Sequence, residues 1–201
     1  MYEKSTQEDM YKLSRCIEYL RNSFEEGRRG VVVKTTRKDL NVEAYIDAAY
    51  GTHIVNGKSQ TGCCITVGDA RIFYYSGKQS IVAKSSTEAE LIGLSDLANQ
   101  VVHVDRIIKE MGYGKKAPTI FQDNESTITL IKKGKSSSMR SRHINIRYFW
   151  LHDLDRHGEV KVEYLPTAQM GPANILTKTL QGCQYRTERF DVTRWDDVIQ
   201  Y

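Results

Sequence analysis

The arrangement of hydrophobic and polar residues changes twice along the chain. Apolar residues at spacings of three and four first predict a short amphipathic helix over residues 9–21. Runs rich in β-branched and aromatic residues, bounded by glycines, then predict strands over 31–36, 41–50, 59–67 and 70–76. Helices and strands alternate after that, at about 86–111 (helix), 118–123 (strand), 125–132 (helix), 144–156 (helix), 160–165 (strand) and 172–180 (helix). This order indicates an α/β fold with a mixed sheet, antiparallel first and parallel later.

Composition and charge narrow the class of protein. Of the 201 residues 40% are hydrophobic, which excludes a disordered tail and supports one real core. The net charge of +4 permits a polyanionic partner without requiring one. No apolar run approaches the roughly 20 residues that a membrane span needs, so we expect no membrane partner and a cytoplasmic location.

Two aspartates on predicted strands are candidates for chemistry. Period-two alternation puts Asp47 on the strand face opposite Ile46, where a half-exposed strand with a polar outer face is the alternative explanation. Asp123 ends a predicted strand, and the carboxyl ends of parallel strands are where ligands bind in open α/β sheets. The alternative for Asp123 is that it, or Asn124, caps the helix that follows.

A third acid, Glu90, lies early in the predicted long helix. If Ser85 caps this helix in a capping box with Glu88, capping does not explain Glu90, which shares the core-facing stripe with Leu94. A carboxylate is rarely found on such a stripe unless it is paired or binds a metal. The alternative is a second box, in which Thr87 caps the helix and Glu90 is its partner.

These three acids together form a pattern typical of a metal-dependent phosphodiesterase. Two hard cations about 4 Å apart prefer oxygen ligands from several elements, and one carboxylate must bridge them. Without metal the cluster costs stability, because like charges at close range raise one another's pKa. A purely structural role would not explain that cost.

Several longer stretches of the chain resemble one known family. They are EAYIDAAYGTH, KSQTGCCITVG, KQSIVAKSSTEAELIGLSD, FQDNESTITLI, SRHINIRYFWLHD and EYLPTAQM followed by ILTKTLQG. In this order, over residues 42–182, they resemble the ribonuclease H domain of copia-type LTR-retrotransposon polyproteins. The opening MYKLSRCIEYLRNS is similar to the end of the preceding reverse-transcriptase connection. The resemblance thus divides the chain into a connection remnant and linker (1–30), a ribonuclease H-like domain (31–182) and a C-terminal extension (183–201).

The resemblance implies a fold and an activity. The fold is ribonuclease H-like, with a five-stranded mixed sheet (three antiparallel strands, then parallel strands) flanked by helices. The implied activity is endonucleolytic hydrolysis of the RNA strand of RNA–DNA hybrids, with two Mg²⁺ or Mn²⁺ ions held by Asp47, Glu90 and Asp123. The implied partners are the hybrid and the reverse-transcriptase part of the same polyprotein, within a virus-like particle if the element is active. The alternative is a catalytically inactive module of this fold, which binds nucleic acid or supports a polymerase domain.

Other positions are candidates for contact with nucleic acid. Ser86 and Asn124 match positions that touch the hybrid backbone in related enzymes, although capping alone is an alternative for both. The stretch 131–142 carries five basic residues and no acid, so it is either a solvated loop or a grip on the phosphate backbone: Lys132, Lys133, Lys135, Arg140 and Arg142. His143 matches a family histidine and has either a catalytic or a packing role.

The chain departs from the family at the fourth acid. The family usually reads A-D-[IV]-L-T-K, whereas residues 173–178 here read A-N-I-L-T-K. Asn174 offers a neutral carbonyl oxygen, so we expect weaker metal binding and reduced cleavage with the fold intact. Pro172 suits a first helical turn but not a helix interior, so we also expect the last helix to start later and to shift Asn174.

Overall fold

The computed structural model of the 201-residue chain describes residues 5–25, 33, 35, 38–133 and 142–193. Within this range the side chains of 23–25, 142–145 and 189–193 are not described. The chain divides into two compact units, Val33–Val192 and Met1–Val32 together with Thr193–Tyr201.

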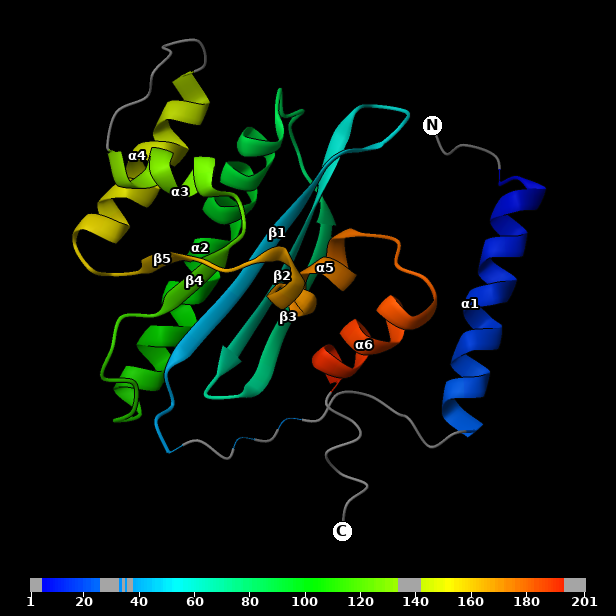
Figure 1. Ribbon diagram of the computed structural model, residues 1–201, viewed down its shortest axis with the longest axis horizontal. Coiled ribbons are helices and arrows are strands. Elements are labelled where there is room, and N and C mark those ends of the chain that lie inside the picture. The colour runs from blue at the N-terminus through cyan, green and yellow to red at the C-terminus, as the bar shows by residue number, and fades with distance from the viewer. Residues whose placement is uncertain (1–4, 26–32, 34, 36–37, 134–141, 194–201) are drawn as a thin grey trace. The chain divides into compact units, whose positions relative to one another are not determined.

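The larger unit is built on a five-stranded mixed sheet with the strand order β3-β2-β1-β4-β5 (Figure 1). The strands are β1 (Val42–His53), β2 (Lys58–Val67), β3 (Ala70–Lys78), β4 (Thr119–Gln122) and β5 (Lys161–Tyr164). The first three strands pair antiparallel, whereas β4 pairs parallel with both β1 and β5. The predicted α/β class and the predicted antiparallel-then-parallel sheet are therefore confirmed.

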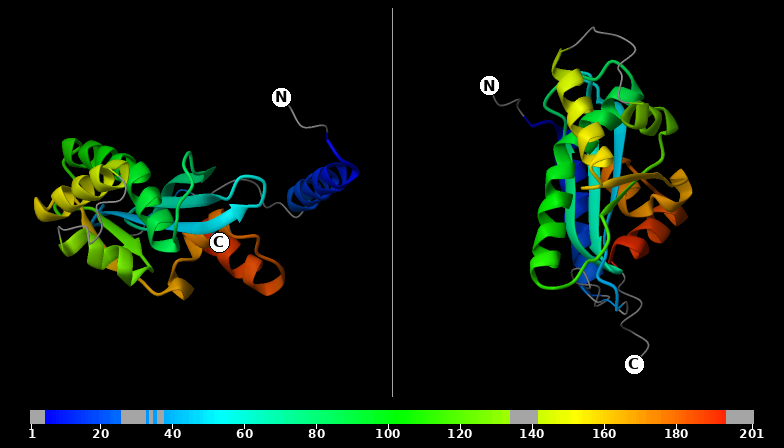
Figure 2. Two further views of the ribbon diagram at one scale, coloured as in Figure 1. Left: turned by 90° about the horizontal axis from the view of Figure 1, so that it is seen from above. Right: turned by 90° about the vertical axis from the view of Figure 1, so that its left-hand side faces the viewer.

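Helices cover both faces of this sheet, as Figure 2 shows. One face carries α2 (Ser86–Glu110), α3 (Glu125–Lys133) and α4 (Arg142–Arg156). The other carries α5 (Gly171–Thr177), which follows the 3₁₀ helix Thr167–Gln169. Helix α6 (Gly182–Thr193) follows α5 on the same side of the sheet. The main core lies between the sheet and the first group of helices, where its fully buried members include Ile46, Ile65, Leu94, Ile120, Leu151 and Val162.

Three details differ from the sequence-based expectations. Only Val33 and Thr35 of the strand predicted at 31–36 are described, and neither lies in a strand. The last predicted helix does not start later, because α5 begins at Gly171 with Pro172 in its first turn, where a missing amide hydrogen costs nothing. Helix α6 was not predicted, since its sequence GCQYRTERFDVT has no regular apolar stripe.

The smaller unit contains the predicted N-terminal helix, α1 (Gln7–Glu25), which extends beyond the predicted 9–21 at both ends. Its apolar stripe is exposed at all four positions: Met10, Leu13, Ile17 and Leu20. Among the helices of the described residues, none is both long enough and apolar enough to cross a lipid bilayer.

Candidate active site

The three acids meet where the sheet changes from antiparallel to parallel pairing. β1 pairs with β4 only over residues 43–45, and the two strands then part. Asp47 lies two residues beyond the last pair on β1, and Asp123 directly follows β4. Together with Glu90 from α2 they offer ligand oxygens that all lie within 4.8 Å of one another. This is the crevice at a topological switch point, the usual place for a ligand in such sheets.

Asp47 is not part of a half-exposed polar strand face. Its relative exposure is only 2%, although it points away from the main core that contains Ile46. Helix α5 covers this second face of β1 and β2. The carboxylate is therefore buried between the sheet and α5.

Glu90 is buried in the crevice and plays no part in capping. Ser85 caps α2 by accepting a hydrogen bond from the amide of Glu88, and Glu88 in turn accepts one from the amide of Lys84. Glu90 is 5% exposed and accepts a hydrogen bond from Gln122 Nε2 at 3.2 Å. Burial, reinforced by the nearby charge of Asp47, raises the pKa of Glu90 to about 9.

Asp123 does not cap α3, although the sequence allowed that role. Asn124 caps α3, because its Oδ1 accepts a hydrogen bond from the amide of Thr127 at 3.1 Å. The Asp123 carboxylate instead accepts a hydrogen bond from Thr167 Oγ1 at 2.7 Å. Asp123 is thus held from the 3₁₀ helix that leads into α5.

The end of α5 supplies two site residues for which sequence reasoning assigned no role, Thr177 and Lys178. Thr177 Oγ1 donates to Asp47 Oδ2 at 2.5 Å, and Lys178 Nζ lies 3.2 Å from the same oxygen. Lys178 Nζ also donates to Asn174 Oδ1 at 2.7 Å. The spacing of Asn174 and Thr177 already places these two residues on one face of a helix, whereas Lys178 is the extended residue that follows α5.

Gly62 allows α5 to approach Asp47. Gly62 is the antiparallel partner of Asp47 on β2. A Cβ atom at this position would lie 2.6 Å from Thr177 Cγ2 and 2.8 Å from the carbonyl oxygen of Ala173. The missing side chain therefore makes room for the helix that brings Thr177 and Lys178 to the site.

The donor set suits a hard divalent cation. Three carboxylates from three elements converge and offer the oxygen ligands that such a cation prefers. The Lys178 ammonium beside Asp47 shows that the site attracts positive charge. Asp47, Glu90 and Asp123 are thus able to hold a metal, with the Asn174 carbonyl oxygen at their edge.

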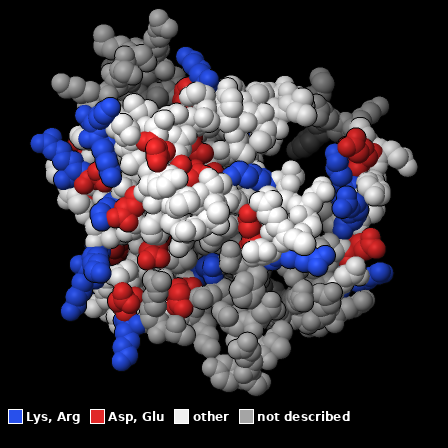
Figure 3. All heavy atoms as spheres, viewed as in Figure 1, with Lys and Arg blue, Asp and Glu red and all other residues white. Residues whose placement is uncertain are grey.

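The candidate nucleic-acid residues are only partly described. Ser86 is exposed in the first turn of α2, and Lys132 and Lys133 are exposed at the end of α3. Lys135 and Arg140 lie outside the described residues, and Arg142 and His143 lie in the first turn of α4 without described side chains. Lys and Arg gather along the left-hand edge in Figure 3, interleaved with Asp and Glu.

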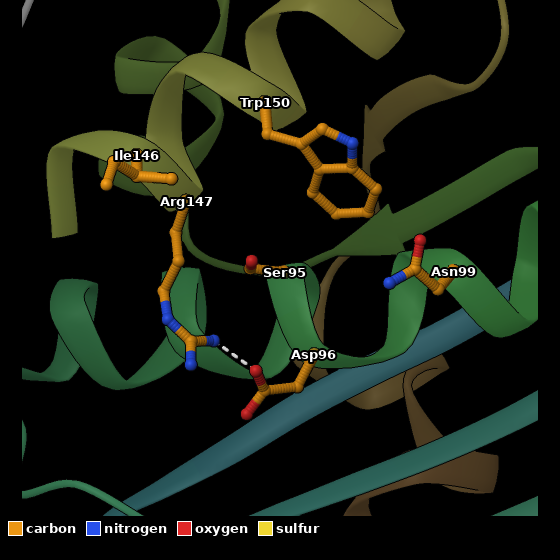
Figure 4. Close-up of a pocket in the computed structure, with 6 residues that line it drawn as sticks. All are labelled: Ser95, Asp96, Asn99, Ile146, Arg147 and Trp150. Atoms are coloured by element: carbon orange, nitrogen blue, oxygen red, sulfur yellow. Dashed lines mark hydrogen bonds and ion pairs between the residues drawn. The ribbon is translucent and has the colours of Figure 1, made fainter. Parts of the chain in front are cut away.

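A separate hollow of about 440 Å³ lies between α2 and α4 (Figure 4). An ion pair between Arg147 of α4 and Asp96 of α2 closes one side of it. Its other lining residues are Ser95, Asn99, Ile146 and Trp150. None of the three clustered carboxylates lines it.

Comparisons with known proteins agree with the resemblance. The chain is similar to the Pol polyprotein of transposon TNT 1-94 from Nicotiana tabacum (32% identity, 71% of this chain, 10% of that polyprotein). It is also similar to the Pol polyprotein of transposon RE1 from Arabidopsis thaliana (27% identity, 94% of this chain, 13% of that polyprotein). A third relative is the Gag-Pol polyprotein of transposon Ty1-NL2 from Saccharomyces cerevisiae (27% identity, 73% of this chain, 8% of that polyprotein). The chain thus spans about a tenth of the length of these relatives. No family model matches it.

Solved structures with the same fold are ribonucleases H. LC11 ribonuclease H1, isolated from compost, superposes with a TM-score of 0.50 at 11% identity over 69% of this chain and 93% of its own. The N-terminal ribonuclease H domain of a Mycobacterium tuberculosis protein superposes with a TM-score of 0.50 at 13% identity, over 75% of this chain and 97% of its own. At these identities the likeness concerns the fold alone. The chain belongs to the Pol polyproteins of copia-type transposons, and its larger unit has the fold of their ribonuclease H domain.

Proposed function

We propose that this chain is a metal-dependent ribonuclease H that hydrolyses the RNA strand of RNA–DNA hybrids during retrotransposon reverse transcription. The observation that carries the proposal is the convergence of Asp47, Glu90 and Asp123 within 4.8 Å at the switch point of the sheet. Two buried carboxylates, Asp47 and Glu90, beside the half-buried Asp123 are unfavourable as charged groups, and a bound cation would compensate them. The ribonuclease H fold and the similarity to transposon Pol polyproteins support the substrate class.

The proposed roles of the residues follow from their contacts. Asp47, Glu90 and Asp123 would hold two divalent cations, Mg²⁺ or Mn²⁺, with Asn174 in the fourth position. When bound, such ions activate the attacking water and stabilise the leaving 3′-oxygen, which gives 5′-phosphate and 3′-hydroxyl ends. Gln122 orients the carboxylate of Glu90 by hydrogen bonding.

The proposed partners are the hybrid and the polymerase part of the same polyprotein. We assign hybrid contacts to Ser86, Asn124, Lys132, Lys133, Lys135, Arg140 and Arg142, and a catalytic role to His143. We further assign residues 1–30 to the end of the reverse-transcriptase connection, 31–182 to the nuclease domain and 183–201 to an extension. The similarity to the RE1 polyprotein supports this division because it covers 94% of the chain, more than the nuclease region alone. The cytoplasm, or the particle of an active element, is the corresponding location.

A second candidate function is a non-catalytic module of the same fold that binds nucleic acid or supports the polymerase. The feature that favours it is the pair formed by Asn174 and Lys178. A neutral amide occupies the fourth position, and the ammonium of Lys178 already compensates part of the charge of Asp47. Asn174 departs from the family's acid, whereas Lys178 matches the family's lysine; together they weaken the attraction of the site for divalent cations.

A cleavage assay separates the two functions. The full chain is incubated with an RNA–DNA hybrid labelled on the RNA strand, in Mg²⁺ or Mn²⁺ and in EDTA. The nuclease predicts metal-dependent cutting that Asp47→Asn abolishes and that Asp39→Asn, a change at an exposed aspartate before β1, leaves intact. Binding of the hybrid without cutting in either metal contradicts the nuclease and favours the non-catalytic module.

A further inference from the structure

A lysine ammonium lies on one side of the proposed metal site. Lys178 Nζ is 3.2 Å from Asp47 Oδ2 and 2.7 Å from Asn174 Oδ1. Both oxygens belong to residues to which the proposed function assigns a metal. A monovalent cation that is part of the chain therefore occupies the space between them.

The contacts of Asn174 hold this arrangement in place. Asn174 Nδ2 donates to the carbonyl oxygen of Thr167 at 2.9 Å, which turns Oδ1 of the same amide toward the ammonium. The backbone amide of Lys178 donates to the carbonyl oxygen of Asn174 at 2.9 Å. The lysine is therefore anchored at its backbone and at its head group by one residue.

The charges explain why the ammonium favours this position. With asparagine in the fourth position, Asp47 is the carboxylate within reach of Lys178. The side chain of Asp47 is only 3% exposed, so its carboxylate is poorly solvated and is stabilised by a nearby cation. The side chain of Lys178 is 38% exposed and is able to withdraw into solvent when another cation takes its place.

We propose that Lys178 is a tethered cation that competes with the second divalent ion for the side of the site formed by Asp47 and Asn174. The inference rests on the proposed function, because it presupposes that the carboxylates bind metal. The side formed by Glu90 and Asp123 stays open to a first divalent ion. A second ion binds only when the ammonium leaves, which makes occupancy by two ions dependent on a high metal concentration.

Binding of Mn²⁺ to the full chain tests this without any substrate. Electron paramagnetic resonance measures free Mn²⁺ during a titration and so gives the number of bound ions and their affinities. Lys178→Met removes the competitor, and we expect the affinity for the second ion to rise about tenfold, as for the loss of one close like-charge repulsion. Lys161→Met, which removes the same charge from an exposed position on β5, is the matched control and leaves both affinities unchanged.

Two further results would contradict either the inference or the proposed function. Lys178→Gln keeps a polar side chain without the charge, and circular dichroism identifies which variants fold. Unchanged or weaker binding of the second ion in the folded Lys178 variants overturns the inference and leaves the proposed function standing. Absence of Mn²⁺ binding in every folded variant overturns the proposed function, and the inference with it.

Discussion

The side-chain amide of Gln122 joins Glu90 to the turn that carries Asp123. Gln122 Nε2 donates to Glu90 Oε2 at 3.2 Å, and Gln122 Oε1 accepts from the backbone amides of Asp123 at 2.8 Å and Asn124 at 3.0 Å. Nε2 also lies 3.4 Å from the carbonyl oxygen of Ile46, across the gap where β1 and β4 part. One fully buried side chain therefore fixes the positions of two of the three carboxylates.

Replacing this amide by a side chain of similar volume is expected to destabilise the fold. Gln122→Met leaves two backbone amides without their acceptor, and we expect the free energy of unfolding to fall by about 2–4 kcal/mol. Urea denaturation of the metal-free chain measures the change. Gln181→Met, at an exposed position, is the control and is expected to stay within about 0.5 kcal/mol of the original chain. Equal stabilities of the two variants would contradict the role of Gln122.

The metal-free chain is expected to lose stability as the pH rises. Burial raises the pKa of Glu90 from 4.5 to about 9, so between these values the folded state keeps a proton that the unfolded state has released. The free energy of unfolding then falls with pH across this window, by at most about 1.4 kcal/mol per pH unit. Denaturation in EDTA at several pH values gives the slope, which Glu90→Gln flattens. A slope that is the same in the original chain and in Glu90→Gln would contradict a raised pKa of Glu90.

Closing the space at Gly62 is expected to displace α5. The Cβ atom of Gly62→Ala would meet Thr177 Cγ2 at 2.6 Å, Ala173 O at 2.8 Å and Leu176 Cβ at 2.9 Å. We expect a loss of about 1–3 kcal/mol in the free energy of unfolding, together with weaker binding of Mn²⁺. Adding Thr177→Ser removes the nearest methyl group and restores part of the stability. The backbone contact with Ala173 remains, so full recovery would contradict the explanation.

Restoring the family's acid is expected to raise activity and to lower metal-free stability. Asn174→Asp adds a carboxylate to the site, and we expect cleavage at a fixed Mg²⁺ concentration to rise about tenfold, a gain of roughly 1.4 kcal/mol in transition-state stabilisation. The same change removes the donor to the carbonyl oxygen of Thr167, so the melting temperature in EDTA falls and Mg²⁺ restores it. Asn174→Ala is the control and gains no activity. If Asn174→Asp also gains none, the loss of activity has another cause.

The basic end of α3 is expected to contribute to binding through charge alone. Changing Lys132 and Lys133 to alanine should weaken hybrid binding and lower the slope of log K against log salt by about 2. Fluorescence anisotropy at several salt concentrations gives this slope. Changing Lys115 and Lys116, an exposed pair before β4, removes equal charge and leaves the slope unchanged. A similar loss in both double variants would indicate an effect of net charge rather than a binding surface.

Much of the fold follows from local pattern. The alternation on β1 places Asp47 opposite Ile46, and the capping box of Ser85 and Glu88 leaves Glu90 on the inner face of α2. These features depend on periodicity and capping, which a sequence displays directly. Local pattern therefore singles out Asp47 and Glu90.

Other features depend on contacts that no local pattern contains. Asp123 and Asn124 are both good caps, and only the register of α3 decides that Asn124 accepts the hydrogen bond from Thr127. The position of Lys178 depends on how closely α5 packs on β2, which the absence of a side chain at Gly62 permits. Tertiary packing, rather than propensity, determines both.

The hydrogen bond between Thr177 and Asp47 joins residues that are 130 positions apart. A contact of such high sequence separation closes a very large loop, which costs entropy and slows folding. A growing polypeptide that has passed Asp123 already contains all three acids but lacks the donor that fixes Asp47. The hydrogen bond that fixes Asp47 therefore cannot form before α5 has been synthesised.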